Sequence, residues 1–320
     1  MRSPASMEQE EVVNGVSRSV AVLACAAMAI FYVAILYAPA LLLRLPPPTS
    51  YSSFMIRRFI CAAISSVVSF IASALILSIR WNSPEGLSAY GIRSDHNWQA
   101  LIFPLSLTSL IYAGSFIVKF LRFLDSYKEH QSFCRNKFVD YIISLPQRVS
   151  EWMLAMVTNI SAWRNYVVAP LTEELVFRAC MIPLLLCGGF SAYTAVFLCP
   201  IFFSLAHLNH FWELYTKKNR NFVKASMAVG FQLGYTVVFG SYASFLFVRT
   251  GHLSGPLISH IFCNYMGIPV IFSRRTGLVT LAFIVGLLGF IWLLFPLTSP
   301  HLFNYKTDTC KCWHGYCNWD

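Results

Sequence analysis

The stretch LTEELVFRACMIPLLLCGGF, residues 171–190, decides the fold class because it embeds charged side chains in an apolar run. Its charged residues are Glu173, Glu174 and Arg178. The surrounding run, 166–188, is long enough to cross a bilayer, which takes roughly 20 predominantly apolar residues. Charged side chains are rare inside membranes, and each costs about 2.5–3.5 kcal/mol at a helix centre. The stretch therefore predicts a membrane helix whose polar groups have a structural or functional role.

The composition of the chain predicts the same environment. Of its 320 residues, 57% are hydrophobic and 12% are charged, whereas soluble domains carry about 25% charged residues. We therefore expect an all-α, polytopic integral membrane protein in which residues 1–320 form a single membrane-embedded domain. About eight transmembrane helices are predicted, at residues 20–43, 59–79, 99–118, 166–188, 191–208, 225–248, 253–272 and 277–295.

The net charge of +10 is spread over short loops between the predicted spans. This distribution is typical of membrane topology rather than of nucleic-acid binding, so the expected environment is a lipid bilayer and no nucleic-acid partner is expected. Of the 24 Lys and Arg residues, 16 lie in the loops after the first, third, fifth and seventh spans. The positive-inside rule places these loops in the cytoplasm and both termini on the opposite side.

Two segments outside the spans have distinct compositions. Residues 119–165 mix Lys and Arg with Phe, Tyr and Trp, which favours amphipathic helices lying at the membrane interface. The tail 297–320 contains Cys310, Cys312 and Cys317. Their spacing matches no standard zinc pattern, so a zinc site and a disulfide both stay open.

Gly230 and Gly234 form a G-x-x-x-G pattern within the sixth predicted span. Small residues at this spacing allow membrane helices to approach closely, so we expect a close helix contact there.

The three charged residues of the opening stretch divide between two faces of its helix. Glu174 and Arg178 are four residues apart, with the acid nearer the N-terminus, which is the favourable order for a helical ion pair. This spacing predicts a structural role for the pair. Glu173 points about 100° away around the helix and has no such local partner. An intramembrane carboxylate of this kind is a candidate functional residue.

Two further polar motifs lie in other predicted spans. Phe203 and His207 share a helix face in FSLAH, and His260 and Asn264 share one in HIFCN. His207 can act as a base or a metal ligand, while an imidazole and an amide on one face can stabilise an oxyanion. Together with Glu173, these groups can activate a water molecule for hydrolysis. Each pair taken alone also fits hydrogen bonds that hold membrane helices together.

Two other functions stay open from the residues. Glu173, His207 and His260 also fit a relay in a proton-coupled membrane transporter, although relays usually have acids on several spans. A non-enzymatic membrane binding protein is the other alternative, although binding alone does not require an oxyanion site.

The order of the three motifs resembles that of the type II CAAX prenyl endopeptidases, the Ras-converting CAAX protease family. E-E-x-x-x-R begins at Glu173, F-x-x-x-H at Phe203 and H-x-x-x-N at His260, so the motifs lie within 173–264. The resemblance implies a multi-pass protease of the endoplasmic reticulum membrane whose active site opens toward the cytosol. It implies removal of the last three residues, a-a-X, from proteins with a farnesylated or geranylgeranylated C-terminal C-a-a-X sequence, such as Ras-type GTPases.

The resemblance also implies a role for each matched residue. Glu173 and His207 would activate the attacking water, and His260 and Asn264 would stabilise the oxyanion. The remaining matched residues would be supporting residues: Glu174, Arg178 and Phe203.

No cofactor is expected to be required, because an amide in the set suits hydrogen bonding better than metal binding. If zinc is used, its ligands would be Glu173, His207 and His260.

Overall fold

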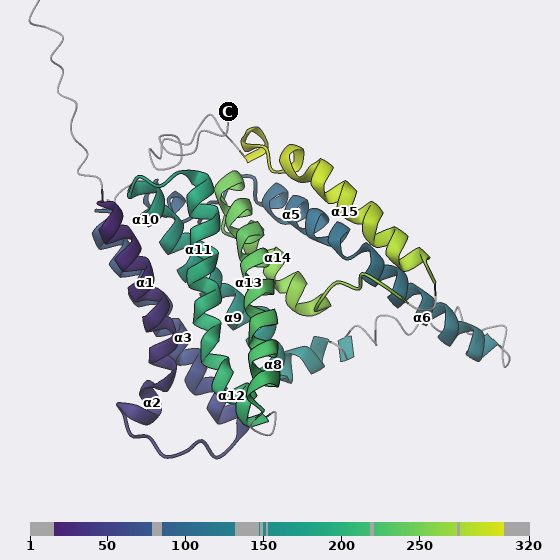
Figure 1. The fold of residues 1–320 in the computed structure, drawn as a ribbon, viewed down its shortest axis with the longest axis horizontal. Helices are drawn as coiled ribbons and strands as arrows, with labels where there is room; N and C mark the ends of the chain where they lie inside the picture. The colour runs from purple at the N-terminus through teal and green to yellow at the C-terminus, as the bar shows by residue number, and fades with distance from the viewer. Residues whose placement is uncertain are drawn as a thin grey trace, which may run out of the picture.

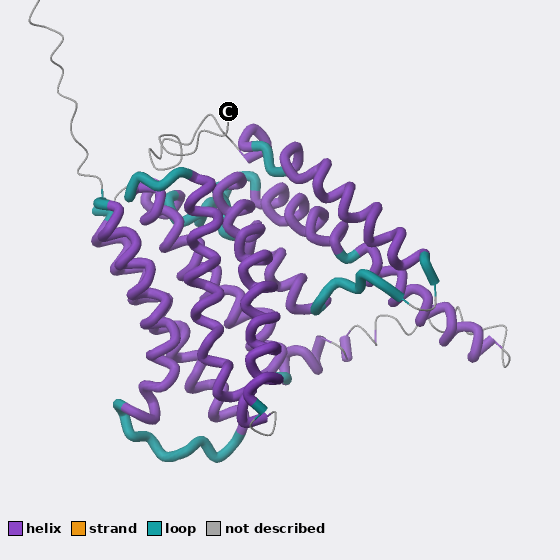
Figure 2. Tube along the Cα trace, viewed as in Figure 1, coloured by secondary structure: helices purple, strands orange, loops and turns teal. Residues whose placement is uncertain are grey.

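The computed structural model describes residues 16–78, 85–131, 147, 150, 151, 153–217, 221–273 and 276–303. Within these ranges the chain forms helices joined by turns and loops and contains no strand (Figure 2). The expected all-α class is therefore confirmed. The longer helices are α1 (Arg18–Ala34), α3 (Tyr51–Ile76), α5 (Asn97–Ile111), α6 (Ala113–Gln131), α11 (Ala192–Ala206), α13 (Phe222–Thr250), α14 (Ser254–Met266) and α15 (Leu278–Leu297).

Short elements connect these helices. They are η2 (Ile35–Tyr37), α2 (Ala38–Leu41), α4 (Glu85–Ser88), η5 (His207–Asn209), α12 (His210–Lys217) and η6 (Pro300–Phe303).

Several helices have the length and apolarity needed to cross a membrane. Among the described residues, five helices meet both conditions: α1 extended to Leu41, α3, α11 extended to Asn209, α13 and α15. A sixth is reached if α5 and α6, which meet at a bend of 73°, form one broken span. The protein is therefore a polytopic membrane protein.

The expected number of about eight spans is not reached among the described residues, and three of the expected spans differ from their prediction. The 166–188 span is interrupted by a π-helical turn and is not among the helices that meet both conditions. The 99–118 span is divided at Tyr112, where α5 ends and α6 begins. The 253–272 span is helical only as α14, because Gly267 ends that helix with a φ of 73°. The 13 residues of α14 rise about 20 Å, less than the roughly 30 Å of a bilayer core.

A continuous helical run from Ile160 to Cys187, the central run, passes through the bundle from α8 at its lower edge to α10 beside α1 (Figure 1). Helices α1, α3, α11 and α13 contact it, and the side chains from Val176 to Leu186 are buried. The charged stretch therefore lies in the protein interior rather than against lipid. The elements of the run are α8 (Ile160–Trp163), the π-helical turn η3 (Arg164–Val168), α9 (Ala169–Glu174), the π-helical turn η4 (Leu175–Cys180) and α10 (Met181–Cys187).

Polar residues fix where several of these apolar helices begin. The hydroxyls of Ser17, Ser50 and Ser191 each accept a backbone N–H three residues further on, which caps α1, α3 and α11. Asn221 caps α13 in the same way. Such caps satisfy N–H groups that the first helical turn leaves unpaired. The apolar runs therefore start at defined residues, and this sets the register of the site.

A second layer of helices flanks the main bundle (Figure 1). α15 packs along α5 and α6, and α14 packs against α5. The close approach of α15 needs Gly286, where a side chain would collide with the Leu110 carbonyl. The Tyr112 hydroxyl donates to the Gly267 carbonyl at 2.6 Å, which fixes the end of α14 against this layer. α14 is thereby held between the second layer and the central run.

The predicted close contact at Gly230 and Gly234 is wrong. A Cβ atom at either position would meet no atom of the described chain within 4 Å. The close approach on α13 occurs instead at Gly240, where a Cβ atom would lie 2.9 Å from Cβ of Pro200 and 3.2 Å from Nη2 of Arg178.

The segment 119–165 is only partly described. Its beginning continues α6 to Gln131, and its end enters the central run at Ile160. Residues 132–146 and 304–320 lie outside the described residues. The interfacial role of this segment and the zinc and disulfide alternatives for Cys310, Cys312 and Cys317 therefore stay predictions, as does the single-domain boundary.

Candidate active site

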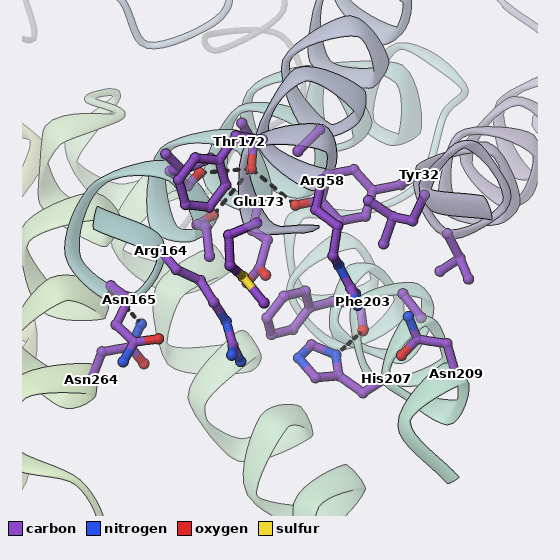
Figure 3. A pocket seen from close by; sticks show the side chains of 18 of the residues that line it. Tyr32, Arg58, Arg164, Asn165, Thr172, Glu173, Phe203, His207, Asn209 and Asn264 are labelled. Carbon is purple, nitrogen blue, oxygen red and sulfur yellow. Dashed lines mark hydrogen bonds between the residues drawn. The ribbon is translucent and has the colours of Figure 1, made fainter. Parts of the chain in front are cut away.

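The structure brings the three sequence motifs to one cavity of about 630 Å³. Its walls come mainly from α1, α3, the central run, α11 and α14 (Figure 3). Glu173, Phe203, His207, His260 and Asn264 all line it. The four candidate catalytic residues therefore face a common space, although they come from segments up to about 90 residues apart.

Glu174 lies behind the cavity wall and joins two motifs. Its Oε1 atom accepts a hydrogen bond from Nη1 of Arg178 at 3.0 Å and lies 2.6 Å from Nδ1 of His260. The side chains of Glu174 and Arg178 are 0% exposed. Because an ionised carboxylate only accepts, Nδ1 of His260 carries a proton and donates it. The ion pair predicted from the spacing is thus present, and it also orients the His260 ring.

Aromatic rings complete the surroundings of Arg178. Its Cζ atom lies 4.5 Å from the ring centroid of Phe203 and 6.0 Å from that of Phe239. Nε and Nη2 of Arg178 have no hydrogen-bond partner in the described chain. Cation–π contacts with the two ring faces offset part of the free-energy cost of burying these unpaired N–H groups. Phe203 therefore stabilises the cation that in turn holds Glu174.

Glu173 points away from this ion pair and into the cavity. Its side chain is 16% exposed, and its Oε2 atom lies 3.8 Å from Nε2 of His260. This separation is longer than a direct hydrogen bond. The neighbouring glutamates thus flank His260 from two sides: Glu174 holds Nδ1, and Glu173 faces Nε2.

His207 lies where α11 ends and the chain tightens into η5. Its Nδ1 atom is 2.9 Å from the carbonyl oxygen of Phe203. A carbonyl oxygen only accepts, so Nδ1 donates, and a neutral ring has its lone pair on Nε2. The Phe203 ring packs edge-on against His207 with centroids 4.8 Å apart. These contacts hold the imidazole in a tautomer that can act as a base through Nε2.

Asn264 contacts a local irregularity of the central run. In η3 the backbone N–H of Ala169 donates to the carbonyl of Arg164, five residues back. The next bond of this series would need the N–H of residue 170, which is Pro170 and has none. The Asn165 carbonyl instead accepts from Nδ2 of Asn264 at 2.8 Å. A proline in one helix thus creates the docking point for an amide from another, at the edge of the cavity.

Sequence reasoning missed several polar residues of the cavity wall. Tyr32, whose hydroxyl lies 2.9 Å from Oγ1 of Thr172, belongs to α1. Arg58 belongs to α3 and Arg164 to η3, and both reach into the cavity (Figure 3). Helical periodicity contains a signal for Arg58, because the lining residues of α3 follow one stripe: Tyr51, Phe54, Met55, Arg58, Phe59 and Ala62.

The arrangement also bears on the zinc alternative. Among the described residues no three His, Cys, Asp or Glu side chains form a group that could hold a metal ion. Both histidines use Nδ1 for hydrogen bonds within the protein, so only their Nε2 atoms could serve as ligands to an ion shared with Glu173.

Comparison with known proteins identifies the family. Residues 155–266, which contain all three motifs, match the family model described as type II CAAX prenyl endopeptidase Rce1-like. The CAAX prenyl protease 2 of Arabidopsis thaliana is 56% identical over 308 residues, which cover 96% of this chain and 98% of the relative. The chain belongs to the type II CAAX prenyl endopeptidase family.

More distant relatives agree with this assignment. The CAAX prenyl protease 2 of Homo sapiens is 35% identical over 295 residues, which cover 89% of this chain and 83% of the relative. No solved structure matches the chain significantly. As a type II CAAX prenyl endopeptidase, the chain is a membrane protease, and the resemblance drawn from its three motifs is confirmed.

Proposed function

We propose that this endopeptidase removes the C-terminal tripeptide a-a-X from proteins whose C-a-a-X cysteine carries a farnesyl or geranylgeranyl group, Ras-type GTPases among them. The observation that carries the proposal is the position of Glu173 opposite His260. A carboxylate and an imidazole face each other across 3.8 Å inside a cavity within the helical bundle. This pairing places a carboxylate that can take a proton from water beside a ring that can stabilise the oxyanion, as hydrolysis of a peptide bond requires.

In the proposed reaction, Glu173 and His207 take a proton from water as its oxygen attacks the carbonyl carbon of the prenylated cysteine. The developing oxyanion is stabilised by hydrogen bonds from His260 and Asn264. The C–N bond to the next residue then breaks, and the proton passes to the leaving amine. The products are a protein ending in prenylated cysteine and a free tripeptide.

The hydrogen bonds of His260 support its part in this scheme. Nδ1 donates to Glu174, so donation from Nε2 to an oxyanion requires the ring to carry both protons. Glu174 and Glu173 supply the negative charge that such a cation needs. Asn264 has two N–H groups, of which one is used by the Asn165 carbonyl and the other can point to the substrate.

We further propose that the protein resides in the endoplasmic reticulum membrane with the cavity opening toward the cytosol. The excess of Lys and Arg in the loops next to the starts of α3 and the central run supports this orientation. Prenylated proteins would then reach the cavity from the cytosolic leaflet.

We propose a mechanism without an obligatory metal. The amide of Asn264 and the Nδ1 hydrogen bonds of both histidines suit proton transfer and hydrogen bonding. Zinc held by Glu173, His207 and His260 is the alternative that the test below separates.

The test uses purified protein in liposomes and measures tripeptide release from a farnesylated C-a-a-X peptide. Its unprenylated twin is the control, and both are assayed with and without a strong chelator. We expect cleavage of the prenylated peptide alone, at a rate that chelation leaves unchanged. Absence of cleavage by folded protein would contradict the proposed substrate. Loss of activity on chelation, with recovery on adding zinc, would overturn the metal-free mechanism.

A further inference from the structure

Two arginines project into the cavity that contains Glu173: Arg58 from α3 and Arg164 from η3 (Figure 3). Glu173 is the one acidic residue among the described residues that line the cavity. Neither arginine takes part in an ion pair with another described residue. The described cavity wall therefore carries more positive than negative charge, which favours an anionic ligand.

Arg58 has the more enclosed position of the two. It is half-buried, with its Cζ atom 5.4 Å from the ring centroid of Phe54, whereas Arg164 is exposed. A guanidinium partly removed from water gains most from a carboxylate, to which it donates two parallel hydrogen bonds. Arg58 is thus the better candidate for a direct contact, with Arg164 adding positive charge nearer the start of the central run.

The position of Arg58 along the helices can be estimated from one contact. The hydroxyls of Tyr51 and Ser161 lie 3.3 Å apart, near the starts of α3 and the central run. Counted from this contact at about 1.5 Å per residue, Arg58 is about 10 Å along α3 and Glu173 about 18 Å along the central run. Along the helix axes the two positions are therefore offset by about 8 Å, before the length of the arginine side chain is included.

An offset of this size, extended by the arginine side chain, is similar in magnitude to the length of the part of the substrate that is released. Three extended residues span about 10 Å, and the last one ends in an α-carboxylate. We infer that Arg58 binds the α-carboxylate of the substrate's C-terminal residue. This inference rests on the proposed function. Arg58 holds the chain end at a fixed distance from Glu173, so that the bond to be cleaved lies three residues from that end.

The test compares two farnesylated peptides that differ only at the chain end, one a free carboxylate and the other a carboxamide. We expect kcat/KM of the wild-type protein to be about 10- to 100-fold higher for the acid, the range for one hydrogen bond to a charged group. In Arg58→Ala this ratio should fall towards one. Arg58→Lys should keep part of it through its point charge.

The neighbouring arginine provides a matched control. Arg57 donates from Nη1 to the Pro46 carbonyl at 2.7 Å and does not line the cavity. Arg57→Ala should therefore keep the wild-type acid-to-amide ratio. The ratio is the decisive readout, since partial loss of folding lowers the rates on both peptides alike. If Arg58→Ala does not fold, Arg58→Gln keeps the side-chain length without the charge and should lose the ratio too.

The results separate failure of the Arg58 inference from failure of the proposed function. A wild-type ratio near one, with both peptides cleaved, overturns the inference and leaves the proposed function intact. Folded wild-type protein that cleaves neither peptide overturns both. An unchanged ratio in Arg58→Ala overturns the assignment to Arg58, and loss of the ratio in Arg164→Ala alone would transfer it to Arg164.

Discussion

The Nδ1 atom of His260 lies 2.6 Å from Oε1 of Glu174, the same oxygen that Arg178 contacts at 3.0 Å. One buried carboxylate oxygen therefore links α14 to the central run. The orientation of a candidate catalytic ring thus depends on an ion pair in another helix. Glu173, the adjacent residue, faces the cavity instead. The two glutamates differ in role because they lie on different faces of one helix.

Glu174→Gln tests the link to His260. Arg178 and His260 contact one oxygen of Glu174, so a glutamine can keep both hydrogen bonds through its amide oxygen, but it removes the negative charge that supports a doubly protonated His260 ring. Replacing the ring-orienting acid of a catalytic histidine in this way lowers kcat by up to about 10⁴ in a well-studied protease. We expect kcat for the farnesylated peptide to fall at least about 100-fold with little change in KM. A kcat near the wild-type value would show that Glu174 serves only the ion pair.

Glu173→Gln tests the proposed role of the cavity glutamate. The substitution removes the proton acceptor but keeps the side-chain volume, and Glu173 makes no direct hydrogen bond within the described chain that would be lost. We expect tripeptide release to fall to background while the free energy of unfolding changes by less than about 0.5 kcal/mol. Turnover and thermal unfolding of the same preparation give both values. Turnover within tenfold of wild type would exclude Glu173 as the base.

Arg178→Ala should destabilise the fold. Arg178 is 0% exposed, and its removal leaves the buried carboxylate of Glu174 without its cation. Breaking a buried ion pair from one side costs about 3–5 kcal/mol. Thermal unfolding in detergent should show the loss. Arg164→Ala, which removes an exposed arginine from the same helical run, is the control and should change stability by less than about 0.5 kcal/mol.

Two glycines of α13 should respond in opposite ways to alanine. At Gly240 the new methyl group would lie 2.9 Å from Cβ of Pro200, so Gly240→Ala should destabilise by about 1–3 kcal/mol. At Gly230 it would meet no described atom within 4 Å, so Gly230→Ala should be neutral or stabilise by up to about 1 kcal/mol. Thermal unfolding of the two variants compares them directly. Equal effects would contradict the packing of α13 against α11.

His252 predicts a dependence of stability on pH. It lies between α13 and α14, outside the membrane-spanning helices, and is 1% exposed. Burial, followed by the nearby Arg93 guanidinium, lowers the pKa of His252 from 6.5 to about 4, against a smaller opposite effect of Asp95. Between these pH values the unfolded chain binds a proton that the folded chain does not. The free energy of unfolding should therefore fall as the pH drops from 6.5 to 4.

The control for this pH effect is His252→Gln. Thermal unfolding at pH 7.5, 5.5 and 4.5 should show a shallower decline in the variant than in the wild-type protein. The same decline in both proteins would assign the pH dependence to other groups.

Features of this protein that depend on local spacing could be predicted from the amino-acid sequence. Hydropathy runs predicted the helices, because a helix in a bilayer satisfies its own backbone hydrogen bonds. The i, i+4 spacing predicted the Glu174–Arg178 pair, and the helical angle separated Glu173 from it. The order of the three motifs was enough to indicate the family.

The tertiary structure decided which of these local features meet. The contact of Glu174 with His260 joins residues 86 apart, and that of Asn264 with Asn165 joins residues 99 apart. Periodicity within one helix contains no information on which face of another helix it will contact. The same limit explains the error at Gly230: a G-x-x-x-G pattern permits close packing, but only the positions of neighbouring helices decide whether it occurs. Long-range packing, which depends on the shapes of all helices together, is what turned three short motifs into one cavity.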